Sequence, residues 1–149
     1  MLRSELQIAL NDLEVACQQA ADGHESAAGT VVDEELAATL RAFAAQHREA
    51  GEILGDRLRD LGDLPSTPDT DLETIKDILS RVKAALSPDE RQSLLEDRVA
   101  AEAKLEHCAD LALEQPELSE ESRAVLNAIR DQARVAQTRL RGFAPRPIP

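Results

Sequence analysis

Residues 33–61 read DEELAATLRAFAAQHREAGEILGDRLRDL, and this stretch decides the fold class. Apolar side chains and one histidine recur in it every three or four residues, which is the period of one face of an α-helix. The side chains on this face belong to Leu36, Leu40, Phe43, His47, Ala50, Leu54, Leu58 and Leu61. Asp33 is a favoured helix cap, and Glu34 and Glu35 suit the positive end of the helix dipole. The stretch therefore predicts a long helix with one buried face.

The same signals predict three further long helices. One runs from about Ser4 to Ala28, where Gly29 offers an end, and another runs from the cap-and-proline sequence at 87–90 to about Glu114. The last begins after Ser119 and ends near Gly142. The inward faces of the first and last of these helices are Leu6, Leu10, Leu13, Cys17, Ala20, His24 and Ala27, and Leu126, Ile129, Ala133, Ala136, Leu140 and Phe143.

The middle of the chain predicts a loop and a shorter helix. Residues 62–70 contain two prolines, and residues 71–86 again show helical periodicity. We therefore expect an all-α antiparallel four-helix bundle over residues 1–143, with a short crossover helix between the second and third long helices. An up-down array of five helices is the competing topology. The proline-rich tail 144–149 is expected to be disordered.

Charge and hydropathy exclude several classes of partner. The chain has 29 Asp and Glu against 17 Lys and Arg, which gives a net charge of −12. This charge repels phosphate backbones, so we expect no nucleic-acid partner. No apolar run approaches the roughly 18 residues that span a bilayer, and Leu2-Arg3 leads into Ser4-Glu5 without a signal-type segment. We therefore expect no membrane partner and a cytoplasmic location.

Four segments carry a resemblance to a known group of proteins. They are Leu10–Leu13, Phe43–His47, Val82–Leu86 and Ile129–Gln137. Through them the chain resembles a bacterial ferritin-like four-helix-bundle family of unknown function, itself distantly similar to stress-associated ferritin-like proteins. The resemblance spans nearly the whole chain and implies a ferritin-like fold.

The metal motif of the wider ferritin-like superfamily is missing. These proteins often hold two irons with one Glu from each of two helices and a Glu-x-x-His pair from each of the others. Here the positions three residues before the histidines hold Ala21, Ala44 and Lys104. The resemblance also implies a histidine near Gln137, where this chain has glutamine. Ferroxidase or oxygenase chemistry is therefore not predicted.

A polar layer is nevertheless predicted at the middle of the bundle. The midpoints of the long helices fall at or beside Glu14, Cys17, His47, Glu102 and Gln132. Imidazole and carboxylate ligands suit iron, manganese or zinc, and Glu106 follows Glu102 by one turn. The sequence thus predicts a metal site formed by His47, Glu102, Glu106 and Glu14. In the alternative interpretation His47 and Glu102 form a buried hydrogen-bonded pair that fixes helix register, or are partly exposed. A stripe of Leu94, Ala101, Leu105, Cys108 and Ala112 fits inward about as well, and would turn Glu102 toward solvent.

The other histidines are not predicted to join this site. Counted from the turn near Val31, His24 lies about 7 residues and His47 about 16 residues along its helix, so their depths differ by roughly 14 Å. Adjacent residues in Glu106-His107-Cys108 point about 100° apart and cannot converge on one ion.

The function predicted from these features is non-enzymatic. Cys17 and Cys108 have no metal-type or CxxC spacing and are expected to be reduced; a disulfide or a reactive thiol is the less favoured alternative. No catalytic motif is found. We therefore expect an association or stress-related module, for example a homodimer that packs through the alanines between Ala100 and Ala103. A single-metal or degenerate di-iron protein is the alternative.

Overall fold

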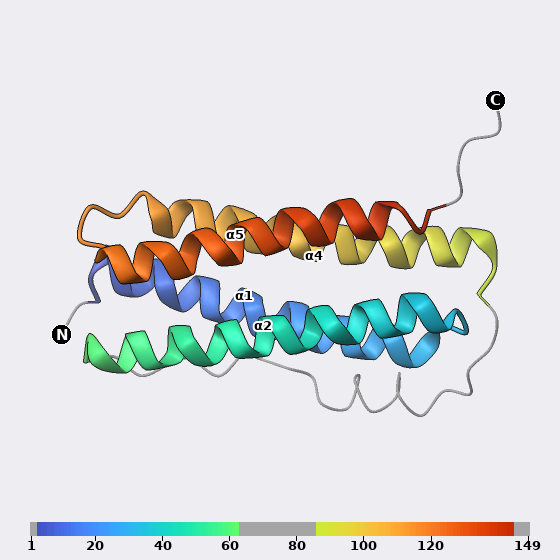
Figure 1. The fold of residues 1–149 in the computed structure, drawn as a ribbon, viewed down its shortest axis with the longest axis horizontal. Helices are drawn as coiled ribbons and strands as arrows, with labels where there is room; N and C mark the ends of the chain where they lie inside the picture. Colours follow the sequence, from blue (N-terminus) through green and yellow to red (C-terminus); the bar gives the residue numbers. More distant parts are fainter. Residues whose placement is uncertain (1–2, 63–85, 145–149) are drawn as a thin grey trace.

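The computed structural model describes residues 3–62 and 86–144, which form a bundle of four long helices (Figure 1). The helices are α1 (Glu5–Thr30), α2 (Glu34–Asp60), α4 (Pro88–Leu113) and α5 (Glu120–Arg141). No strand occurs within these two ranges, so the all-α prediction is confirmed. The predicted helix at 71–86, apart from Leu86, lies outside the described residues, as do most of the predicted loop and tail.

Polar side chains cap the start of each described helix. In α4 the hydroxyl of Ser87 accepts a hydrogen bond from the backbone N–H of Glu90, and the Glu90 carboxylate accepts one from the backbone N–H of Ser87. A cap of this kind stabilises a helix by about 1 kcal/mol. The four N-cap residues are Ser4, Asp33, Ser87 and Ser119. The predicted starts of these four helices are therefore confirmed.

Two helix ends differ from prediction. Helix α1 continues through Gly29 to Thr30, because the Thr30 hydroxyl donates to the Ala27 carbonyl and Val31 then turns to an extended, buried conformation. Leu61, predicted to face inward, caps α2 and is 43% exposed. The predicted inward stripe of α2 therefore ends one turn earlier, at Leu58.

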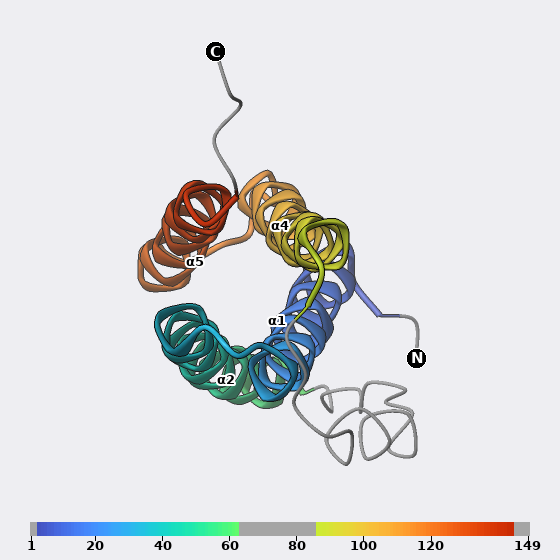
Figure 2. The same cartoon turned by 90° about the vertical axis from the view of Figure 1, so that its right-hand side faces the viewer.

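The helices are arranged as two hairpins. Helices α1 and α2 run in opposite directions, as do α4 and α5, whereas α2 and α4 run in the same direction (Figure 1). Seen along the bundle, α1 lies between α2 and α4, and α5 lies beside α4 (Figure 2). Helices α2 and α5 contact each other only sparsely. The main contact between the hairpins is thus α1 against α4.

A polar layer separates two hydrophobic clusters in the core. The first cluster contains Leu13, Cys17, Leu54 and Leu105 among its members, and the second contains Leu36, Leu40, Phe43, Leu95 and Leu140 among others. Along α1, α2 and α4 the residues between the clusters include His24, His47 and Glu102, all at most 1% exposed. Each fully buried leucine contributes about 1.5–3 kcal/mol to folding, so the clusters stabilise the bundle on both sides of this layer.

Within the described ranges, the helices carry too many polar residues for any of them to cross a lipid bilayer.

Candidate functional site

Three helices each contribute one buried polar side chain to the middle of the bundle. His24 comes from α1, His47 from α2 and Glu102 from α4. The Nε2 atoms of His24 and His47 lie 2.8 Å and 2.5 Å from the same carboxylate oxygen, Oε1 of Glu102. One ligand atom from each of the three side chains lies within 4.8 Å of the others. We call this group the His–Glu–His triad.

The triad places an ionised carboxylate in the core. Burial raises the pKa of Glu102, but the hydrogen bonds from His24 and His47 outweigh burial, so the pKa of Glu102 is below its usual value. Burial lowers the pKa of His24 and outweighs the opposing effect of Glu102. The geometry therefore corresponds to a neutral His24 that donates its Nε2–H to an ionised Glu102.

The triad is not fully satisfied by protein groups. Glu102 Oε2 and His47 Nδ1 are both buried and have no hydrogen-bond partner among the residues that the structure describes. Nδ1 of His24 faces the guanidinium of Arg98, whose Nη1 lies 3.5 Å away. Most buried polar atoms in proteins are hydrogen-bonded, so two orphaned atoms in one small group require an explanation.

Comparison with known proteins places the chain in a family. Residues 6–115 match the family described as Domain of unknown function (DUF2383). The chain belongs to this family. The matched DUF2383 region contains His24, His47 and Glu102, whereas α5 lies beyond it. No curated protein matches the chain.

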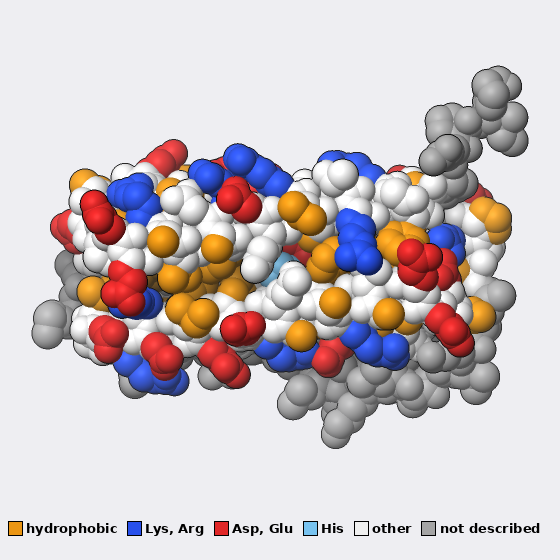
Figure 3. All heavy atoms as spheres, viewed as in Figure 1, with side chains coloured by type: hydrophobic (Ala, Val, Ile, Leu, Met, Phe, Trp, Pro, Cys, Tyr) orange, Lys and Arg blue, Asp and Glu red, His pale blue; other side chains and the backbone are white. Residues whose placement is uncertain are grey.

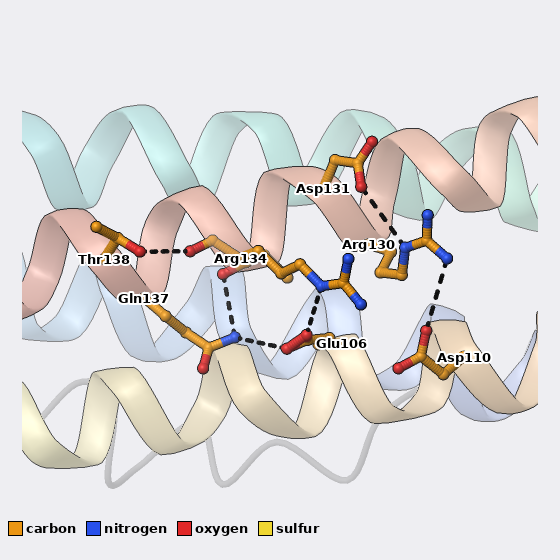
Figure 4. A network of polar contacts seen from close by, with 8 residues as sticks. Glu106, Asp110, Arg130, Asp131, Arg134, Gln137 and Thr138 are labelled. Atoms are coloured by element: carbon orange, nitrogen blue, oxygen red, sulfur yellow. Dashed lines mark hydrogen bonds and ion pairs between the residues drawn. The ribbon is translucent and has the colours of Figure 1, made fainter.

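Within the DUF2383 region, the structure separates Glu106 from the rest of the predicted site. Its carboxylate points toward α5, where it accepts hydrogen bonds from Arg134 Nε at 3.0 Å and Gln137 Nε2 at 3.2 Å (Figure 4). The Arg134 hydrogen bond is the largest influence on Glu106 and lowers its pKa. Glu106 thus links α4 to α5 and is not a member of the triad.

Glu14 is also apart from the triad. It is only 3% exposed, and one of its carboxylate oxygens accepts a hydrogen bond from Gln18 at 2.8 Å while the other has no partner within residues 3–62 and 86–144. Burial raises the pKa of Glu14. Gln132, predicted in the polar layer, is exposed on α5. The predicted layer is therefore smaller than expected, and His47 and Glu102 are its two predicted members that meet.

The exclusion of His24 from this layer was wrong. The depth estimate counted residues along two straight helices and ignored the direction of the side chains. On a helix each Cα–Cβ bond tilts toward the N-terminus. His24 therefore leans away from the α1–α2 turn while His47 leans toward it, which removes part of the counted offset, and their ring centres lie 5.7 Å apart. The signal for His24 was present in the sequence, because it occupies the inward stripe of α1.

The structure decides which face of α4 points into the core. Glu102 is 0% exposed, and Leu95, Leu105 and Ala109 are buried with it, so α4 turns Glu102 into the core.

Cys17 is buried and Cys108 is half-buried, and neither forms a disulfide. Burial is the main cause that raises the pKa of both thiols, which opposes thiolate chemistry.

Proposed function

We propose that the protein is a ferritin-like bundle that binds one divalent transition-metal ion through His24, His47 and Glu102. The observation that carries the proposal is the convergence of two imidazoles and one carboxylate from three helices in the core. Parallel second and third long helices are typical of bundles with a long crossover, and the helix directions of Figure 1 support the ferritin-like relationship.

The donor set fits such an ion. Two His nitrogens and one carboxylate form a common ligand set for zinc and for non-haem iron, and they also suit manganese. The orphaned Oε2 of Glu102 offers a second oxygen at the same position. Metal-bound histidines ordinarily donate their other ring N–H to an acceptor, and the described part of the chain offers none to His24 or His47. The three ligand atoms therefore suit a metal ion, whereas the groups around the two Nδ1 atoms do not supply the acceptors that metal-bound histidines ordinarily have.

Binding requires a small adjustment of the triad. The 2.5 Å and 2.8 Å contacts are hydrogen bonds that hold a proton between nitrogen and oxygen. Two ligands of one zinc ion stand about 3.3 Å apart, because each bond is about 2.0–2.1 Å long and the geometry is tetrahedral. We therefore expect the two shared protons to move to the Nδ1 atoms of the imidazoles when an ion binds, while the side chains move by less than about 1 Å.

A furrow on the surface supplies a route toward the core. Figure 3 shows a hollow between α5 and α2 that is lined mainly by hydrophobic side chains, with a histidine side chain visible at its middle. This hollow follows the seam where α2 and α5 contact each other sparsely. An ion entering along this seam would cross little packed structure.

Elemental analysis of the untagged protein tests the proposal. The purified chain is reconstituted separately with zinc, iron(II) and manganese(II), and free metal is removed before measurement. We expect one ion per chain, and we expect His24→Ala, His47→Ala and Glu102→Ala each to abolish binding. His107→Ala is the matched control, because His107 lies on α4 but is exposed. Equal metal content in all four variants, or no stoichiometric metal in the parent, would refute metal binding at the triad.

A second proposal is self-association, for which the described surface offers one observation. Ile8 and Leu111 are 46% and 43% exposed and line an apolar groove between α1 and α4. Ala100 and Ala103 are exposed on α4 as well. A homodimer would cover this apolar surface. Light scattering coupled to size-exclusion chromatography tests it, and a constant monomer mass across concentrations would exclude the dimer.

A further inference from the structure

The guanidinium of Arg98 lies beside the triad in a space that exists because residue 23 has no side chain. We call this space the Gly23 notch. Arg98 lies on α4, one turn before Glu102, and its guanidinium rests against Gly23 of α1. A Cβ atom built on Gly23 would lie 2.0 Å from Arg98 Nη1 and 2.7 Å from Cζ, which are overlaps. Glycine is unfavourable inside a helix, yet Gly23 stands well inside α1. The notch therefore has a specific occupant.

The guanidinium selects one proton arrangement on His24. Arginine has only donors, so its approach to His24 Nδ1 requires a lone pair on that nitrogen. The proton must then lie on Nε2, where it is donated to Glu102 at 2.8 Å. The positive charge of Arg98 also lies near the ionised Glu102 and balances it. Arg98 thus supports the hydrogen-bonded, metal-free form of the triad.

A metal ion requires the opposite arrangement. To bind through Nε2, His24 needs a lone pair there and a proton on Nδ1, which would then face the donors of Arg98. Metal-bound histidines need an acceptor at this place. The ion would also add positive charge close to the guanidinium.

We propose that Arg98 competes with the metal ion for the triad, so that its guanidinium must leave the Gly23 notch when an ion binds. This inference rests on the proposed metal site. Arg98 acts here as a positioning residue, which lowers the affinity for metal and keeps the bundle assembled without it.

Two variants empty the notch in different ways. Arg98→Gln removes the charge and provides an amide oxygen that can accept from His24 Nδ1. Gly23→Ala keeps the charge but pushes the guanidinium out, and the end of a flexible side chain can move. Arg41→Gln is the control for net charge, because Arg41 is exposed on α2.

The test measures zinc affinity by competition with a chromophoric chelator. We expect both notch variants to bind zinc about 10–100-fold more tightly than the parent, and we expect Arg41→Gln to match the parent. Nitrogen-15 NMR of the imidazole rings gives a second readout: metal-free parent protein should carry the His24 proton on Nε2. Zinc addition should move it to Nδ1.

Three outcomes of the zinc-affinity measurement support or overturn the role of Arg98. Tight binding by both notch variants, including the case in which only they bind, supports competition by Arg98. A parent that binds zinc with variants of equal or lower affinity overturns the role of Arg98 but leaves the metal site intact. Failure of all chains to bind overturns both proposals.

Discussion

Replacing His47 by alanine tests whether the triad holds the bundle together. Glu102 is 0% exposed, its Oε2 has no partner among the described residues, and its Oε1 lies 2.5 Å from His47 Nε2. Loss of one hydrogen-bond donor to a buried carboxylate costs about 1.5–3 kcal/mol, and His24 and Arg98 still lie beside Glu102 in this variant. Domains of this size are stable by about 5–15 kcal/mol, so the loss is a large fraction. The melting temperature should fall by about 5–10 °C.

Urea unfolding followed by far-ultraviolet circular dichroism at pH 7 measures this loss, since the chain has no Trp or Tyr for fluorescence. The same buffer should contain a chelator, so that metal does not contribute. The double variant His47→Ala/Glu102→Gln removes the charge together with its partner and should recover most of the stability. His107→Ala, on the exposed face of α4, should change stability by less than about 0.5 kcal/mol. A loss below about 1 kcal/mol for His47→Ala, or a further loss from Glu102→Gln, would contradict the reasoning.

Three further predictions concern acid, thiols and capping. Because burial lowers the pKa of His24, the unfolded chain binds a proton that the folded chain rejects; stability should therefore fall by up to about 1.4 kcal/mol per pH unit below about pH 6.5. Burial raises the pKa of Glu102, but the histidine hydrogen bonds lower it below its usual value, so a second loss of stability should begin below about pH 4.3. In urea titrations at different pH values, His24→Gln should lack only the first loss of stability. Ellman's reagent should label half-buried Cys108 first and Cys17 only in urea, and equal rates in the native state would contradict this. Ser87→Ala should lower the free energy of unfolding by about 1 kcal/mol through loss of its capping box, and an unchanged urea midpoint would show that the cap is unimportant.

The sequence was informative about the fold because its signals are local. Periodic leucines, the capping serines and Asp33 each act within one or two turns, and the four described helices follow them closely. Helix α4 was harder, because it packs against both α1 and α5 and therefore has no single apolar face. Neither of two plausible stripes could be preferred from α4 alone, and only its neighbours decide that Glu102 points inward.

The candidate site was predictable in part for the same reason. His47 and Glu102 were found from their places near the middle of long helices. His24 was missed because its position depends on the geometry of the turn and on the tilt of two side chains across it, and a count of residues along the axis does not contain this information. Arg98 and Gly23 were missed because their contact joins helices that are distant in sequence. Neither residue has a local pattern that predicts it.

The arrangement in two hairpins makes the triad a crosslink between them. Both histidines belong to the α1–α2 hairpin, whereas Glu102 belongs to the α4–α5 hairpin. Any separation of the hairpins therefore breaks both histidine contacts in a single event. A bound ion would oppose that separation with a free energy that grows with the logarithm of its concentration above the dissociation constant. Exchange of amide hydrogens at the α1–α4 contact should consequently slow as metal is added, while the caps at the far ends of the helices continue to fray.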